Sequence, residues 1–286
     1  MRVKWTLRRA MIEDRFRTSS RSPEPPDRAA EGEYTPRPGI GQPPGGGWPA
    51  ISIVLPAVNE EAALPGTLDS IARQCGAPPF EVILADGGSI DRTVATFARL
   101  TRDWDSRRTA ARVVVCDRPG RAVQMNAGAA AARGAVILFL HADTALPDGA
   151  LRAVSRAMAD DAVSGGGFAL AFADGGALLR LIAAWATWRS RLRRIHYGDQ
   201  APFVRRSVFD RIGGVPQMAL FEDLELARAV KRAGRVVSLP LAVATSARRL
   251  REAGIARTAL RFAWLKLRYA CGGHPGDLKE RYPDVR

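Results

Sequence analysis

The sequence predicts an α/β fold in which a mostly parallel central sheet is flanked by helices. Three short apolar runs, at residues 51–55, 80–85 and 136–140, have the length and the Val and Ile content of strands that are buried on both faces. Polar residues follow each run, and segments with helical spacing of apolar residues lie between the runs. Strands that alternate with helices in this way form parallel, doubly wound sheets.

The first half of the chain repeats the order strand, polar loop, helix. Pro56 is expected to end the first strand, and the segment 91–93 is expected to open the second helix. In chain order, the expected elements are a strand at 51–55, a helix carrying Leu64, Leu68 and Ile71, a strand at 80–85, a helix carrying Val94, Phe97 and Leu100, a strand at 112–116, a helix at 122–133 and a strand at 136–140.

The second half of the chain departs from this order. A helix is expected at 147–158, and the alternating residues 168–172 indicate an antiparallel addition to the sheet. A helix that begins at residue 221 is expected to end at Gly234, a residue type common at helix ends.

Two further helices carry apolar faces among many arginines. Leu178, Leu181, Ile182, Trp185 and Trp188 mark one face, which we expect to pack in the core, with a membrane-facing role as the alternative. The segment 257–270 is a basic amphipathic helix with an apolar face of Leu260, Ala263, Trp264 and Leu267. It either packs against the domain or docks on anionic lipid.

Size and composition predict one catalytic domain at residues 49–249. A disordered leader rich in Pro and Gly is expected at 1–48, and a basic helix and tail at 250–286. The formal net charge of +14 implies anionic partners, such as nucleotide phosphates, an acidic membrane surface or nucleic acid.

The three cysteines and the apolar runs bear on the location of the protein. The cysteines lie far apart, with neither a disulfide framework nor a zinc spacing, and the longest apolar runs fall short of the roughly 20 residues of a spanning helix. The sequence therefore predicts a cytoplasmic protein, with peripheral attachment at the inner face of the membrane as an alternative.

Carboxylates stand where a parallel sheet binds its ligand. Glu60, Asp86, Asp143 and Asp223 lie at or near the ends of expected strands or the starts of expected helices. His141 and Asp143 alternate in an extended segment, so both side chains can face one ligand or one divalent ion. Each carboxylate also has a structural explanation, because Asp favours turns and acidic residues favour helix N-termini.

Five segments in this order resemble the family-2 glycosyltransferases of GT-A fold, which transfer a sugar from a nucleotide-sugar donor. The resemblance spans residues 48 to about 249 and implies a GT-A, Rossmann-like sheet. The segments that carry it are Ile51–Glu61, Val82–Thr93, Gly120–Gly128, Phe139–Thr144 and Phe221–Leu226.

The resemblance implies a donor site at the ends of the first strands. Pro56, Ala57 and Glu60 are expected to hold the base and ribose, and Asp86 to accept a hydrogen bond from the imide N–H of a base, by default uracil. Arg121 is expected near the base or the diphosphate, because a guanidinium binds phosphate oxygens bidentately.

His141 and Asp143 stand where the family has an Asp-x-Asp motif. The resemblance makes Asp143 the ligand of Mn²⁺ or Mg²⁺, which neutralises the charge of the leaving diphosphate. His141 departs from the motif. It either shifts the metal preference, since imidazole suits Mn²⁺ better than Mg²⁺, or contacts only the ribose.

Asp223, beside Glu222, resembles the general base of inverting members of the family. It is expected to take the proton of the acceptor hydroxyl, and a neighbouring carboxylate can raise the pKa of such a base toward the working range.

The acceptor is a small molecule or a lipid-linked compound in this interpretation. The chain also resembles a bacterial subgroup labelled arsenosugar-biosynthesis or radical-SAM/selenodomain-associated glycosyltransferases. Asp199 and Gln200 either line the acceptor pocket or form a polar turn before Pro202. The alternatives are a nucleotidyltransferase on a similar scaffold and, less favoured, a nucleic-acid-binding or membrane-binding protein; nucleic acid is not an expected partner because the placed carboxylates repel phosphates.

Overall fold

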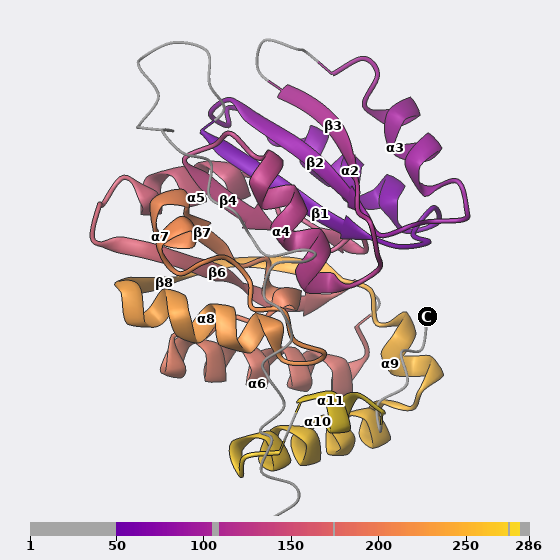
Figure 1. Ribbon diagram of the computed structural model, residues 1–286, viewed down its shortest axis with the longest axis vertical. Coiled ribbons are helices and arrows are strands. Elements are labelled where there is room, and N and C mark those ends of the chain that lie inside the picture. Colours follow the sequence, from indigo (N-terminus) through magenta and orange to yellow (C-terminus); the bar gives the residue numbers. More distant parts are fainter. Residues whose placement is uncertain (1–49, 105–108, 174, 274, 281–286) are drawn as a thin grey trace, which may run out of the picture. The chain divides into compact units, whose positions relative to one another are not determined.

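A computed structural model of the chain describes residues 50–104, 109–173, 175–273 and 275–280. The expected leader at residues 1–48 and the end of the expected tail lie outside these ranges. The described residues form an eight-stranded sheet with the order β3-β2-β1-β4-β7-β6-β8-β5 (Figure 1).

The strands are β1 (Ile51–Ala57), β2 (Phe80–Asp86), β3 (Thr109–Val115), β4 (Val136–Phe139), β5 (Thr144–Ala145), β6 (Val163–Phe172), β7 (Phe203–Arg205) and β8 (Arg235–Thr245). The helices are α2 (Leu64–Ala72), α3 (Thr93–Leu100), α4 (Arg121–Ala131), α5 (Ala150–Met158), α6 (Ala177–Arg193), α7 (Arg206–Arg211), α8 (Glu222–Ala233), α9 (Arg248–Glu252), α10 (Ile255–Ala270) and α11 (Pro275–Glu280), with a short 3₁₀ helix η1 (Gly198–Gln200).

Most neighbouring strands run parallel, which confirms the predicted fold class. β1 pairs in parallel with β2 and β4, β2 with β3, and β6 with β8. The antiparallel pairs are β4 with β7, β6 with β7, and β5 with β8. The alternating segment 168–172 therefore belongs to a strand with an antiparallel partner, as expected, but that strand starts earlier and is parallel to β8.

The central strands are mostly apolar because helices cover both faces of the sheet. Ile53 packs in a cluster with Leu68 of α2 and Val154 of α5. Its neighbour Val54 points the other way, into a cluster with Met125 of α4 and residues of α7 and α8. Alternation along β1 thus serves two apolar layers rather than one apolar and one solvated face.

The strand order reverses between β1 and β4. The chain builds β1, β2 and β3 in one direction and then returns to place β4 on the other side of β1. Ligands of such sheets bind in the crevice beyond the carboxyl ends of the strands at this reversal. The segments after Ala57 of β1 and Phe139 of β4 lie there.

Pro56 does not end the first strand, contrary to the sequence expectation. β1 continues to Ala57, with Pro56 opposite Ala85 in the register with β2. On the other side, the register with β4 already ends at Val54 opposite Phe139. The missing N–H of Pro56 therefore leaves the paired part of the β1–β4 ladder intact.

The expected core face of α6 is wrong. Leu181, Trp185 and Trp188 are 68%, 60% and 55% exposed, whereas the smaller Ala183, Ala186 and Ser190 are buried. The helix packs through this narrow stripe, and Ala183 and Ala186 cluster with Leu170 of β6. Small residues let the helix axis approach the sheet closely, which leaves the large side chains on the outer face.

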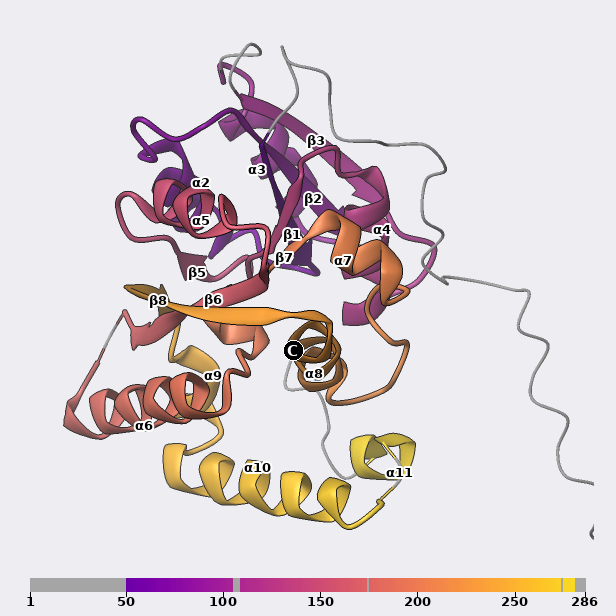
Figure 2. The same cartoon turned by 90° about the vertical axis from the view of Figure 1, so that its left-hand side faces the viewer.

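The helix α10 also presents its apolar face outward. Leu260 and Leu267 are 73% and 63% exposed, while Leu265 is buried in a cluster with Phe221, Leu224 and Leu278. Figure 2 shows α6 and α10 next to each other on the same side of β6 and β8. None of the helices in the described ranges is long and apolar enough to cross a bilayer.

Candidate active site

The carboxyl ends of β1 and β2 lie side by side and bring expected donor-binding residues together. Ala57 is paired with Asp86, and the N–H of Gly87 donates to the Ala57 carbonyl at 3.0 Å. The buried Gln124 amide of α4 donates to the carbonyls of Ala57 and Ala85 at 2.7 and 3.0 Å. Gln124 therefore fixes the end of both strands, a role that its place in the sequence did not indicate.

Asp86 is buried and turned onto its own loop. Its carboxylate accepts hydrogen bonds from the N–H of Gly88 at 3.1 Å, the N–H of Ser89 at 3.1 Å and the Ser89 hydroxyl at 2.5 Å. Asp86 thus has the turn-forming role that is common for Asp. A carboxylate has about four acceptor positions, so a nucleobase that binds here shares it with this turn.

Glu60 lies in a loop that is joined to the loop after β2. Its N–H donates to the Thr93 hydroxyl at 2.8 Å, and the N–H of Glu61 donates to Asp91 at 3.1 Å. These bonds, together with the buried position of Glu60, make the two loops one unit. The pKa of Asp91 is lowered below its usual value because hydrogen bonds from Thr93 and Glu61 outweigh its desolvation.

Arg121 joins two of the other expected site residues. Its guanidinium hydrogen-bonds to Nε2 of His141, and its Nε lies 3.6 Å from a carboxylate oxygen of Glu222. A guanidinium only donates, so His141 accepts through Nε2. Residues from α4, the segment after β4 and α8 thus meet at one point.

Gly198 makes this meeting possible. A Cβ atom at this position would overlap the Arg121 guanidinium and come within 2.9 Å of His141 Nε2. The N–H of Gly198 also donates to the Asp223 carboxylate at 3.0 Å. One glycine in η1 therefore connects the Arg121 cluster to the expected general base.

Asp143 is held through its backbone. Its carbonyl accepts from the N–H of Ser246 at 3.1 Å, and the next residue, Thr144, pairs with Thr245 of β8. Its half-buried carboxylate accepts only a long 3.4 Å bond from the Thr144 hydroxyl among the described residues. Carboxylate oxygens of Asp143 are thus available to a ligand.

The residues present fit a metal ion that takes most of its ligands from the phosphates of a bound nucleotide and from water. No three His, Cys, Asp or Glu side chains gather as a metal-binding cluster within the described ranges. Mg²⁺ in such sites takes one or two carboxylates, with substrate phosphates and water as the other ligands. Asp143 would supply one such carboxylate, while Nε2 of His141 is engaged by Arg121.

Asp223 sits in the first turn of α8, at a fixed position. One carboxylate oxygen accepts from Gly198 and the other from the N–H of Leu224 at 2.7 Å. The preceding Phe221 has a left-handed backbone (φ 71°), and its ring stacks on Tyr269 of α10 with centroids 4.8 Å apart. The C-terminal helices therefore help to position the start of α8.

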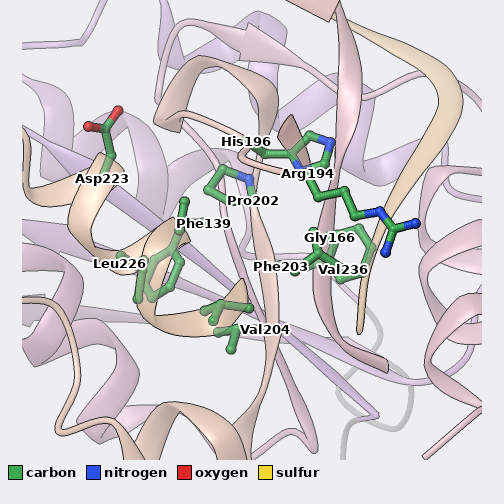
Figure 3. Close-up of a pocket in the computed structure, with 12 residues that line it drawn as sticks. Phe139, Gly166, Arg194, His196, Pro202, Phe203, Val204, Asp223, Leu226 and Val236 are labelled. Atoms are coloured by element: carbon green, nitrogen blue, oxygen red, sulfur yellow. The ribbon is translucent and has the colours of Figure 1, made fainter. Parts of the chain in front are cut away.

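A small cavity of about 20 Å³ adjoins Asp223 and is lined mainly by apolar side chains, among them Phe139, Phe203 and Leu226 (Figure 3). This volume holds about one water molecule and is too small for a nucleotide sugar. His196 also lines the cavity, and its burial lowers its pKa to about 4, so its ring is neutral at pH 7.

The two expected acceptor residues have different surroundings. Gln200 is buried, accepts from the Ser190 hydroxyl at 2.6 Å and donates to the Phe168 carbonyl at 3.1 Å, bonds that hold η1 against α6 and β6. The pKa of Asp199 is raised, first by burial and then by Asp223. Of the pair, Asp199 is the one that is coupled to the Asp223 carboxylate.

The structure adds three residues that the sequence did not single out. Arg189 of α6 and Lys266 of α10 each place their charge over the ring of Tyr197, at 4.4 and 4.3 Å from its centroid. Arginines and lysines in a basic helix are usually solvated, so their spacing carried no signal of this convergence.

A parallel α/β sheet with carboxylates beyond its strand ends at a topological reversal is the architecture of a ligand-binding α/β enzyme. The chain belongs to glycosyl transferase family 2, whose model matches residues 52–213, more than half of the chain. The predicted family-2 glycosyltransferase domain is confirmed. Membership of this family leaves the nucleotidyltransferase and nucleic-acid alternatives without support.

Curated relatives come from mycobacteria. A PGL/p-HBAD biosynthesis glycosyltransferase of Mycobacterium tuberculosis is 40% identical over 101 residues, which are 34% of this chain and 37% of the relative. The chain thus matches little more than a third of that protein. An uncharacterized glycosyltransferase of Mycobacterium bovis is 29% identical over 195 residues, 66% of this chain and 83% of the relative.

Solved structures of glycosyltransferases share the fold. Glucosyl-3-phosphoglycerate synthase from Mycobacterium tuberculosis, in complex with Mn²⁺, UDP and glucosyl-3-phosphoglycerate, matches with a TM-score of 0.54 and 23% identity over 78% of this chain and 80% of the other. TarS of Staphylococcus aureus matches with a TM-score of 0.55 and 18% identity over 69% and 60%. Mannosyltransferase PcManGT from Pyrobaculum calidifontis, in complex with GDP-Man and Mn²⁺, matches with a TM-score of 0.53 and 18% identity over 70% and 57%.

Proposed function

We propose that the protein is an inverting, metal-dependent glycosyltransferase that moves a sugar from a uridine nucleotide sugar to a hydroxyl group. The observation that carries the proposal is the bridge through Gly198, which joins the Asp223 carboxylate to the Arg121–His141 pair. A proton acceptor and a cation for the leaving group therefore stand on opposite sides of one short loop at the strand edge.

The donor is proposed to bind along the edge that Gln124 fixes. Pro56, Ala57 and Glu60 enclose the base and ribose, and Asp86 accepts from the imide N–H while it caps its own turn. Arg121 binds the diphosphate. The solved relative with Mn²⁺ and UDP supports uridine, whereas the relative with GDP-Man shows that this fold also accepts guanosine.

The chemical step is a single displacement. Asp223 takes the proton from the acceptor hydroxyl, whose oxygen forms a bond to the anomeric carbon from the face opposite the diphosphate. The bond from the anomeric carbon to the diphosphate oxygen breaks, and the nucleoside diphosphate leaves with the electron pair. Inversion at the anomeric carbon follows from this geometry.

Asp143 is proposed to hold Mn²⁺ or Mg²⁺ against the diphosphate. When bound, the ion supplies charge neutralisation of the leaving group. Arg121 stabilises the same charge through its guanidinium, and Glu222 orients Arg121 through their contact at 3.6 Å. His141, engaged by Arg121, positions that side chain rather than the metal.

The exposed faces of α6 and α10 support docking on an anionic membrane. The two helices carry eight of the ten large apolar side chains that stand exposed in the described ranges. Their sequences contain seven arginines and one lysine, and neither contains Asp or Glu. A helix with this pattern lies in the lipid interface, which places a lipid-linked acceptor within reach. The narrower likeness to the arsenosugar-biosynthesis subgroup stays a prediction and does not identify the acceptor.

Product analysis tests the proposed reaction. The protein is incubated with UDP-glucose, UDP-galactose or UDP-N-acetylglucosamine and Mn²⁺, and nucleoside diphosphate release is measured with and without a panel of hydroxyl acceptors. We expect one donor to release UDP, and proton NMR of the product to show an inverted anomeric centre. Release of pyrophosphate from a nucleoside triphosphate, or retention of configuration, would contradict the proposal.

A further inference from the structure

Two cations from different helices converge on one aromatic ring beside the candidate base. The guanidinium carbon of Arg189 lies 4.4 Å and the ammonium nitrogen of Lys266 lies 4.3 Å from the centroid of the Tyr197 ring. Tyr197 directly precedes η1, so this pair stands next to Gly198 and Asp199. The ring face attracts each cation but carries no net charge to neutralise two of them.

Neither cation has an ion-pair partner within the described ranges. Arg189 and Lys266 lie more than 4.0 Å from every described carboxylate oxygen, although both side chains are half-buried. Two nearby cations do have a close oxygen partner. Arg228 pairs with Glu225 at 2.6 Å, and Lys231 donates to the Arg193 carbonyl at 2.8 Å. The two charges thus both lie over the Tyr197 ring, and neither has a carboxylate oxygen in contact.

The electrostatics of Lys266 agree with this geometry. Burial, and then the Arg189 charge, lower the pKa of Lys266, although Asp223 and Asp199 act in the opposite direction. The surroundings therefore disfavour the charged ammonium even with two carboxylates nearby. A bound anion would remove this deficit, because an opposite charge in contact favours the ionised form.

The same interactions place the cations beside the reaction centre. Asp199 and Asp223 both act on Lys266, and Arg189 and Lys266 both act on Asp199. Asp223 is in turn bonded to the Gly198 N–H. Burial, and then the Asp223 charge, raise the pKa of Asp199.

We propose that Arg189, Lys266 and Tyr197 form an acceptor subsite that binds a phosphate group next to the hydroxyl that Asp223 deprotonates. Two cations that have no carboxylate in contact match a phosphate monoester, which carries about −1.5 to −2 charges at neutral pH, better than a single carboxylate. The guanidinium can bind two phosphate oxygens, and the ammonium acts as a point charge. The inference rests on the proposed sugar transfer, and it defines the acceptor as a phosphorylated alcohol, either free or in a lipid.

Site-specific labelling tests the subsite without a mutation. The full chain is treated with a dilute acetylating reagent in inorganic phosphate or in chloride of equal ionic strength, and acetylation of each lysine is measured by mass spectrometry. Phosphate is expected to slow acetylation of Lys266 at least fivefold and to leave Lys231 unchanged. Equal acetylation of Lys266 in the two salts would overturn the proposal.

Substitution of Arg189 provides a second readout at the same lysine. In the Arg189→Met variant we expect protection of Lys266 by phosphate to fall below twofold, while Arg180→Met, an exposed position on the same helix, keeps the protection of the wild type. Circular dichroism confirms that both variants are folded. If phosphate still protects Lys266 fully in Arg189→Met, Arg189 does not bind the phosphate, and the two-cation subsite is refuted.

Two phosphate sources separate the possible acceptors. Protection by glycerol phosphate in solution supports a soluble phosphorylated acceptor, and protection only by phosphatidylcholine vesicles that contain phosphatidic acid supports a lipid phosphate. Protection by neither source overturns the subsite. Release of UDP from the donor in the absence of acceptor tests the proposed function separately. If UDP is released but neither phosphate source protects Lys266, the subsite is refuted and the proposed function stands.

Discussion

The ends of β1 and β2 differ from the surface made by α6, η1, α8 and α10 in how their polar groups are satisfied. At the strand ends, Gln124, Asp86 and Thr93 all bond to nearby loops or strands. On the helical surface, Arg189 and Lys266 have no carboxylate in contact, and large apolar side chains face outward. In the first region these polar groups find their hydrogen-bond partners within the fold, and in the second region charged and apolar side chains are left for a partner.

This difference predicts separate roles for the two regions. A preformed edge suits donor binding, because the cost of ordering the loops is already met within the fold. The helical surface is proposed to carry the groups that select an acceptor. We expect substitutions in the first region to affect stability and donor binding, and substitutions in the second to affect transfer and partner choice.

The largest expected effect is that of Asp223→Asn, where the two regions meet. Loss of the general base should reduce kcat for sugar transfer about 10³-fold while the donor dissociation constant changes less than threefold. The amide keeps the shape of the side chain and can still accept a hydrogen bond from Gly198. Steady-state kinetics and calorimetry measure the two quantities.

Asp148→Asn is the matched control, since Asp148 is exposed and lies outside the candidate site. Its kinetics should equal those of the wild type. Turnover of Asp223→Asn within tenfold of the wild type would remove the assignment of the base.

Acid should lower the free energy of unfolding through protonation of His196, which lies just before η1. Burial lowers the pKa of His196 from 6.5 to about 4, so the folded protein resists a proton that the unfolded chain accepts. Stability is complete above pH 6.5 and falls as the pH drops toward 4, by about 3 kcal/mol from this residue.

Denaturant unfolding at several pH values measures this contribution. In His196→Leu the loss between pH 7 and pH 4 should be smaller than in the wild type by about that amount, although the variant also loses the contact with the Ser238 hydroxyl at 3.0 Å. Parallel pH profiles for the two proteins would show that His196 is not the buried titrating group.

Gln124→Ala should break the preformed edge. The substitution removes donors to the Ala57 and Ala85 carbonyls in a buried site and should lower the free energy of unfolding by about 2 kcal/mol. It should also weaken donor binding, because the strand ends lose their brace. Gln217→Ala, at an exposed position, should change stability by less than about 0.5 kcal/mol. Equal stabilities of the two variants would contradict the comparison.

The smallest expected effect concerns membrane docking. Replacement of Trp185 and Trp188, whose rings stack 5.0 Å apart, by serine should reduce co-sedimentation with anionic vesicles about tenfold. Binding of the wild type should fall in high salt, because the arginines of both helices contribute. Ile90→Ser, at an exposed apolar residue in the loop before α3, should leave co-sedimentation unchanged. Indifference of the wild-type protein to anionic lipid would exclude the docking surface.

The central sheet was predictable because its strands are continuous apolar runs. β2 was predicted to within one residue and β1 to within two, and β4 ends one residue before the predicted end. β7 has only three residues, and β8 carries partly exposed residues and Pro240, so neither gave a clear pattern. Parts of the sheet that depend on pairing rather than on composition were missed.

The site was predictable only as a set of residues at strand ends and helix starts. Motifs named Asp86, Arg121, Asp143 and Asp223, but no spacing indicates that Gly198 lies between Arg121 and Asp223. The outward face of α6 was also hidden, because its apolar residues fit a core helix equally well by spacing. Contacts between residues far apart in the chain require the fold itself.

A calorimetric titration of UDP into the wild-type protein and into Asp143→Ala, each with Mn²⁺ and with the ion removed by chelation, tests the central claim most directly. We expect UDP to bind the wild type at least tenfold more tightly with Mn²⁺, and this metal dependence to vanish in Asp143→Ala. If UDP fails to bind the wild type in either condition, or if the metal dependence is unchanged in the variant, the strand edge around Asp143 is not the donor site.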